Sequence, residues 1–81
     1  MFESKKKMYL KLIISSNCAA CERAKKQLQR IQTDNPKIKV EIIHINLFKD
    51  RSIFITPALL LNNELFSYGD IDENKLLSRL N

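Results

Sequence analysis

The chain has no tryptophan, one histidine and one glycine among its 81 residues, and aromatic residues make up only 7% of it. Nucleic-acid-binding domains usually combine stacking aromatic side chains with basic residues gathered on one face. Here the net charge of +5 comes from lysines and arginines that are spread along the sequence. We therefore expect no nucleic-acid partner, and we interpret the basic residues as a solvated surface.

Long apolar segments are also missing. The apolar runs are only a few residues long, whereas a membrane-spanning helix needs about 20 residues. Segment 1–7 contains three lysines but no apolar stretch of the kind found in a signal peptide. We expect this segment to be a flexible basic N-terminus, and we expect a cytoplasmic protein with no membrane partner. In that compartment a cysteine pair is more often catalytic or metal-binding than structural.

The length of 81 residues allows one small hydrophobic core. The hydrophobic fraction of 44% is that of a folded protein. The sequence contains no internal repeat, low-complexity tract or linker. We therefore expect residues 1–81 to form a single domain.

The two cysteines, Cys18 and Cys21, enclose Ala19 and Ala20 at the point where a strand-like pattern changes to a helical one. Two thiols at this spacing can close a small disulfide ring. The N–H groups at a helix N-terminus can also stabilise a thiolate on the first cysteine. The pair therefore indicates thiol–disulfide chemistry, although the same spacing also occurs in metal sites.

The helical pattern separates the two sulfurs. Apolar residues recur at steps of three and four, which predicts an amphipathic helix of about four turns with Asn17 as its N-cap. Cys21 lies on the apolar stripe, whereas Cys18 lies at the exposed start of the helix. Pro36 ends the helix. The residues of the predicted buried stripe are Cys21, Ala24, Leu28 and Ile31.

The remaining pattern predicts three further strands and a final helix. The first strand, within 9–14, and the second, 39–45, flank the long helix and should be parallel. Segment 48–55 has room for a short helix or a loop. Strands 58–61 and 64–68 should form an antiparallel hairpin around Asn62-Asn63. Asp70 and Glu73 resemble a capping box that opens the last helix. The apolar face of that helix would be Leu76, Leu77 and Leu80, and the phenylalanines expected in or near the core are Phe48, Phe54 and Phe66.

This order, βαβ(short α or loop)ββα with a four-stranded mixed sheet, resembles the thioredoxin/glutaredoxin superfamily, and within it the small redox-active disulfide proteins. The cysteine motif opens the first helix, and Thr56-Pro57 precedes the third strand, where the family places a cis-proline facing the cysteines. A turn at Gly69-Asp70 then leads into the last helix. The resemblance implies an α/β thioredoxin-like fold and a thiol–disulfide oxidoreductase. In that enzyme Cys18 attacks a protein or low-molecular-weight disulfide, Cys21 resolves the mixed disulfide, and Thr56 and Pro57 bind substrate.

The chain also departs from the family pattern. Ala19-Ala20 replaces the Gly-Pro of typical thioredoxins and the Pro-Tyr of typical glutaredoxins, so the direction of exchange is not predicted. Leu12 stands where thioredoxins carry a buried acid. Gly69 and Asp70 match half of the pattern with which glutaredoxins hold glutathione. They would form a rim for substrate, and glutathione stays open as a co-substrate. No other cofactor is expected, and the oligomeric state is not predicted.

Two alternatives remain. The first is a metal-binding protein, because paired thiolates also bind zinc or copper. Two cysteines supply only half of a tetrahedral zinc shell, and His44 is the sole histidine, so we expect no metal site. The second is a redox-inert interaction module, since thioredoxin-like folds also serve as docking domains. Such a module would not need paired thiols at the start of a helix.

Overall fold

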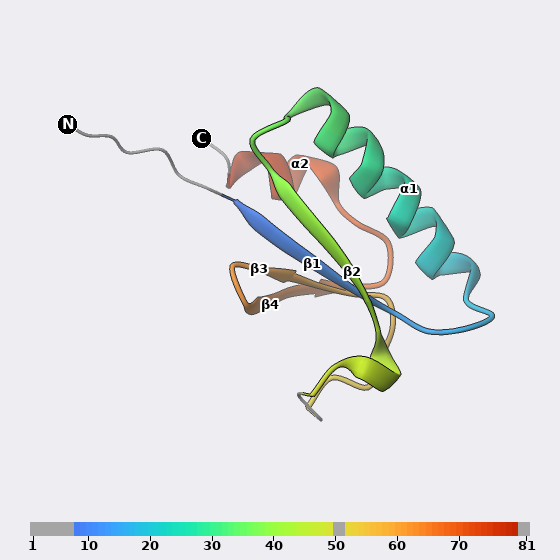
Figure 1. Ribbon diagram of the computed structural model, residues 1–81. Coiled ribbons are helices and arrows are strands. Elements are labelled where there is room, and N and C mark those ends of the chain that lie inside the picture. The colour runs from blue at the N-terminus through green and yellow to red at the C-terminus, as the bar shows by residue number, and fades with distance from the viewer. Residues whose placement is uncertain (1–7, 50–51, 80–81) are drawn as a thin grey trace.

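A computed structural model describes residues 8–49 and 52–79. Segment 1–7, predicted to be a flexible N-terminus, and Leu80, predicted to face the core, lie outside these residues. The described elements follow the predicted order (Figure 1). They are β1 (Tyr9–Ile14), α1 (Ala19–Asp34), β2 (Lys39–His44), the 3-10 helix η1 (Ile45–Leu47), β3 (Ala58–Leu61), β4 (Glu64–Tyr68) and α2 (Glu73–Ser78).

The four strands form one mixed sheet in the order β2-β1-β3-β4. β1 is parallel to β2 and antiparallel to β3, and β3 is antiparallel to β4. Both predicted pairings are confirmed. Because β3 runs opposite to β1 and β2, the ends of β1 and β2 and the start of β3 meet at one end of the sheet. That end also holds the start of α1 (Figure 1).

α1 buries the predicted stripe of Cys21, Ala24, Leu28 and Ile31. Its N-cap is Cys18, and the prediction of Asn17 is wrong by one residue. Asn17 has a left-handed backbone, with φ of 54°, whereas Cys18 is extended and its sulfur accepts the N–H of Cys21. An N-cap residue takes this extended conformation. Asn35 follows the helix, and its N–H donates to two carbonyl groups of the last turn.

One face of the sheet is covered by helices. Leu10 and Leu12 of β1 point to this face, together with Leu59 and Leu61 of β3, and α1 and α2 pack over them (Figure 1). Alternate residues of a strand point to opposite faces, so a regular strand supplies every second side chain to this cluster. We call it the helix-covered face. Its buried residues are Met8, Leu10, Leu12, Ala24, Leu28, Ile31, Ile38, Leu59, Leu61, Ile71 and Leu76.

The opposite face is covered by the connection between β2 and β3, and we call it the loop-covered face. Its buried cluster is smaller and consists of Ile13, Ile53, Ala58 and Leu60. Ile43, Ile45 and Phe48 pack against these residues and are partly buried. Phe54 is 76% exposed, which corrects the prediction that it packs in or near the core. The connection is too short to turn every apolar side chain inward.

The last helix begins two residues later than the capping-box pattern predicts. Asp72 is its N-cap, and its carboxylate accepts the N–H of Lys75 at 3.2 Å. Glu73, expected to reach back to the cap, instead accepts hydrogen bonds from Gln27 and Arg30 of α1. These bonds hold α2 against α1. Leu76 of α2 is fully buried and Leu77 packs against the core.

Candidate active site

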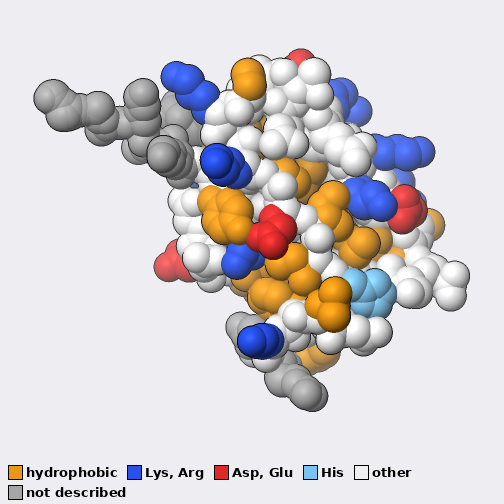
Figure 2. Space-filling view, viewed as in Figure 1, with side chains coloured by type: hydrophobic (Ala, Val, Ile, Leu, Met, Phe, Trp, Pro, Cys, Tyr) orange, Lys and Arg blue, Asp and Glu red, His pale blue; other side chains and the backbone are white. Residues whose placement is uncertain are grey.

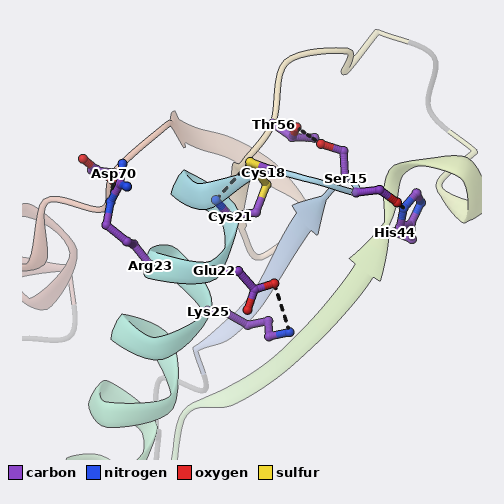
Figure 3. The surroundings of a disulfide bond; sticks show 10 residues. Ser15, Cys18, Cys21, Glu22, Arg23, Lys25, His44, Thr56 and Asp70 are labelled. Carbon is purple, nitrogen blue, oxygen red and sulfur yellow. Dashed lines mark hydrogen bonds and ion pairs between the residues drawn. A yellow bond between two sulfur atoms is a disulfide. The ribbon is translucent and has the colours of Figure 1, made fainter.

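Cys18 and Cys21 form a disulfide at the start of α1, with their Cα atoms 5.1 Å apart (Figure 3). The exposures of the two residues differ as the helical phase predicts: Cys21 is fully buried and Cys18 is half-buried. The backbone N–H of Cys21 donates to the Cys18 sulfur at 3.0 Å. The first turn of α1 therefore presents an N–H group to the more accessible sulfur.

Thr56 and Pro57 lie at the start of β3, and the peptide bond between them is cis, as the resemblance implies. Pro57 is buried and Thr56 is half-buried. The Thr56 hydroxyl is hydrogen-bonded to the Ser15 hydroxyl, with an oxygen-to-oxygen distance of 2.6 Å. Ser15 follows β1 and precedes Cys18 by three residues. We call residues 15–18 the cysteine loop and Thr56-Pro57 the proline segment, and this bond joins the two (Figure 3).

Ser16 makes a second connection from the same loop. Its hydroxyl lies 3.1 Å from Nε2 of His44, the last residue of β2. Nδ1 of His44 accepts the backbone N–H of Asn46 at 3.2 Å. Since Nδ1 accepts, a neutral His44 ring carries its proton on Nε2 and donates to Ser16. His44 thus serves as the N-cap of η1 and as a support for the cysteine loop.

The predicted rim, Gly69 and Asp70, follows β4, and Asp70 lies on the other side of the disulfide from Thr56 (Figure 3). The Gly69 N–H donates to the Pro57 carbonyl at 2.8 Å, so the predicted rim is attached to the proline segment. The Asp70 carboxylate pairs with Arg23 at 3.3 Å. Lys25, the other cation close to the motif in sequence, pairs with Glu22 at 3.7 Å. Both cations near the start of α1 therefore face carboxylates.

Within residues 8–49 and 52–79, no three or more His, Cys, Asp or Glu side chains are grouped so that they could hold a metal ion. Across the same residues, no helix has the length and apolar character needed to cross a membrane.

The sequence profile of the thioredoxin domain matches residues 8–80, nearly the whole chain. The chain belongs to the thioredoxin-domain family. Among solved structures, it resembles thioredoxin from Fasciola hepatica with a TM-score of 0.70 and 11% identity, over 91% of this chain and 78% of the other. It resembles thioredoxin f2 from Chlamydomonas reinhardtii with a TM-score of 0.70 and 14% identity, over 98% and 81%. It resembles thioredoxin from Trichomonas vaginalis with a TM-score of 0.69 and 16% identity, over 90% of this chain and 76% of the other.

These structural matches show that the chain has a thioredoxin-like fold, as the sequence predicted. No curated protein sequence matches the chain significantly. A thioredoxin domain with a bonded cysteine pair supports a redox function in general. Leu12 is fully buried in the helix-covered cluster, and no charged residue among residues 8–49 and 52–79 is buried. Leu12, at the position where the resemblance implies a buried acid in thioredoxins, is therefore an apolar core residue of this thioredoxin domain.

Ser15 and Ser16 were not predicted to belong to the site, and His44 was considered for it as a metal ligand. The strand register of the structure explains the contact that Ser15 makes. Ile13 lies opposite Ala58 in the β1–β3 ladder, and the same register two residues further on places Ser15 opposite Thr56. Serine and threonine side chains in such cross-strand positions commonly form hydrogen bonds.

Proposed function

We propose that this thioredoxin domain is a thiol–disulfide oxidoreductase in which Cys18 is the nucleophile and Cys21 the resolving thiol. The observation that carries the proposal is the asymmetry of the pair at the start of α1. Cys18 is half-buried and accepts the Cys21 N–H at 3.0 Å, whereas Cys21 is fully buried. A substrate can reach the first sulfur, and the second is held beside it.

Two exchange steps complete the reaction. The Cys18 thiolate attacks one sulfur of a substrate disulfide, forms a mixed disulfide and releases the other substrate sulfur as a thiolate. The Cys21 thiolate then attacks the Cys18 sulfur, forms the Cys18–Cys21 bond and releases the second substrate thiolate. The two protein thiols lose two electrons and two protons, which the substrate gains as it becomes two thiols. The same steps in reverse oxidise a substrate dithiol.

The N-terminus of α1 favours the Cys18 thiolate. A helix N-terminus carries a partial positive charge, and its unpaired N–H groups point toward an anion placed at the cap. Cys18 occupies that cap position, and the Cys21 N–H contacts its sulfur. Arg23 and Lys25 would contribute less, because each faces a carboxylate and exposed charges are screened by salt.

We propose a protein segment as the substrate, with its backbone paired to Thr56 beside Pro57. Phe54 and Ile55 directly precede Thr56 and are 76% and 50% exposed. Leu47 of η1 is 77% exposed, and hydrophobic side chains gather beside the pale blue His44 at the end of β2 (Figure 2). Such a surface suits apolar residues that flank a substrate cysteine. Glutathione, which is small and anionic, would contact the rim at Gly69 and Asp70.

A redox titration with thiol trapping in glutathione buffers tests this function. The wild-type chain should show one two-electron transition for the Cys18–Cys21 pair, and Cys18→Ser should abolish it. Cys21→Ser should accumulate a mixed disulfide with a peptide disulfide whose cysteine has apolar neighbours. Cys18→Ser is the matched control and should capture little peptide, because Cys21 is fully buried.

Each alternative gives a different result. A pair that stays reduced at every potential while holding stoichiometric zinc or copper would identify a metal-binding protein. A pair that titrates, but whose Cys21→Ser variant captures neither the peptide nor glutathione, would favour an interaction module over an oxidoreductase. Capture of glutathione in preference to the apolar peptide would contradict the proposed protein substrate and leave the exchange chemistry in place.

A further inference from the structure

Ser15 connects the two parts of the proposed site. It lies three residues before the nucleophile, and its hydroxyl is hydrogen-bonded to Thr56 at 2.6 Å. The β1–β3 ladder ends at Ile13 and Ala58, so the Ser15–Thr56 bond extends the contact between these strands by one more cross-strand pair, toward the disulfide (Figure 3). The Ser15–Thr56 bond joins two side chains beyond the last residues that are paired through their backbones.

On the N-terminal side of Thr56, two exposed residues separate it from the nearest buried side chain, that of Ile53. Phe54 and Ile55 are largely exposed, and buried contacts resume at Pro57. On the C-terminal side the Pro57 carbonyl accepts the Gly69 N–H. The position of the Thr56 backbone relative to Cys18 is therefore fixed by the Ser15 hydroxyl from one side and by Pro57 from the other.

We infer that Ser15 is a positioning residue that holds the Thr56 backbone where a substrate segment pairs with it. This inference rests on the proposed function, because it assumes that substrates bind along Thr56. Ser15 contacts neither a sulfur nor the substrate in this scheme. Its loss should weaken substrate binding and leave the chemistry of the cysteine pair unchanged.

The neighbouring serine provides a matched control. Ser16 has the same side chain and lies in the same loop, but its hydroxyl lies beside His44 at the end of β2 and not beside Thr56. Ser16→Ala removes one hydroxyl from the cysteine loop without touching the proline segment. A general loosening of the loop would affect both variants, whereas positioning of Thr56 would affect only Ser15→Ala.

The experiment compares wild type, Ser15→Ala, Ser15→Thr and Ser16→Ala in reduction of the apolar peptide disulfide. Ser15→Ala should raise KM by about two- to tenfold, the factor that one net hydrogen bond supplies. Its kcat and the midpoint potential of the cysteine pair should match those of wild type. Ser15→Thr, which keeps the hydroxyl, should restore KM, and Ser16→Ala should leave it unchanged. Circular dichroism would establish that each variant is folded.

Other results would overturn the inference. An unchanged KM in Ser15→Ala, an equal rise in Ser16→Ala, or no rescue by Ser15→Thr would show that Ser15 does not position Thr56. A shifted midpoint potential in Ser15→Ala would show that it acts on the cysteines. If Ser15→Ala does not fold, Thr56→Val gives the same test from the other partner. A wild-type chain without exchange activity would overturn the proposed function as well, so the two failures are distinguishable.

Discussion

The two faces of the sheet are built from the same strands but differ in what covers them. Among residues 8–49 and 52–79, the buried cluster of the helix-covered face has eleven residues, including side chains of α1 and α2, whereas that of the loop-covered face has four. Next to the smaller cluster, Phe54 and Leu65 remain exposed, and the Ser15–Thr56 pair lies at the end of the same strands. We infer that the helix-covered face supplies most of the stability. The loop-covered face leaves apolar side chains exposed.

The largest expected loss of stability comes from a charge placed on the helix-covered face. Leu12→Asp places a carboxylate at a fully buried position, which should cost about 4 kcal/mol of unfolding free energy at pH 7. Burial raises the pKa of the introduced carboxyl, so the folded chain binds its proton more tightly than the unfolded chain does. The loss should therefore be smallest in acid and grow as the pH rises above about 4. Urea denaturation across pH measures it.

Leu12→Asn is the control for this experiment. It introduces a polar side chain of similar size that does not titrate, so its cost should not vary with pH. A loss in Leu12→Asp that is equal at pH 4 and pH 7 would mean that the cost comes from shape and lost apolar contacts alone.

Cavities on the two faces should lower the free energy of unfolding by different amounts. Leu28→Ala removes a fully buried side chain beneath α1 and should cost about 3 kcal/mol. Ile53→Ala removes a side chain that is 6% exposed, from the connection that covers the other face. It should cost about 2 kcal/mol, because an irregular segment can settle into the space. Chemical denaturation compares the two. Equal losses would contradict the difference in stability between the faces.

The smallest expected effect on stability concerns the loop-covered face between β1 and β2, where Tyr9 donates a hydrogen bond to Glu41. This bond raises the pKa of Tyr9 above 10.0, and desolvation and the charge of Glu41 act in the same direction. The folded chain therefore retains the phenol proton more strongly. The stability that this supplies is present below pH 10 and is lost as the pH rises through the raised pKa.

Glu41→Gln tests this contact. It should lower the pKa of Tyr9 toward 10.0, since the carboxylate acceptor and its charge are removed. An ultraviolet titration of phenolate absorbance in Glu41→Gln, with Tyr68→Phe as the background, measures the shift. No change in the titration would mean that Glu41 does not accept from Tyr9 in solution.

The sequence predicted the elements because they depend on local periodicity, and it predicted the β1–β2 and β3–β4 pairings because these join strands that follow each other along the chain. The burial of Cys21 followed from its helical phase, which is counted along one segment. The caps were predicted less well. Asn17 and Asp70 are good capping residue types, but the cap is decided by which residue adopts an extended backbone, and those residues are Cys18 and Asp72.

The side-chain contacts of the site could not be predicted from local patterns. Ser15 and Thr56 are 41 residues apart, and Ser16 and His44 are 28 apart. Their meeting depends on the register of three strands at once. The exposure of Phe54 was also missed, because composition shows that a side chain is apolar but not whether a short connection can bury it.

Gly69, the only glycine of the chain, has φ of +75°, and a Cβ built on it would meet no atom within 4 Å. The turn therefore requires glycine for its left-handed backbone conformation, and there is room for a side chain. An L-residue is strained in this region, whereas a D-residue prefers it by mirror symmetry. In a chemically assembled chain, D-alanine could replace Gly69 and remove the freedom of glycine from the unfolded state. The turn that donates to the Pro57 carbonyl could thus be stiffened through chirality alone.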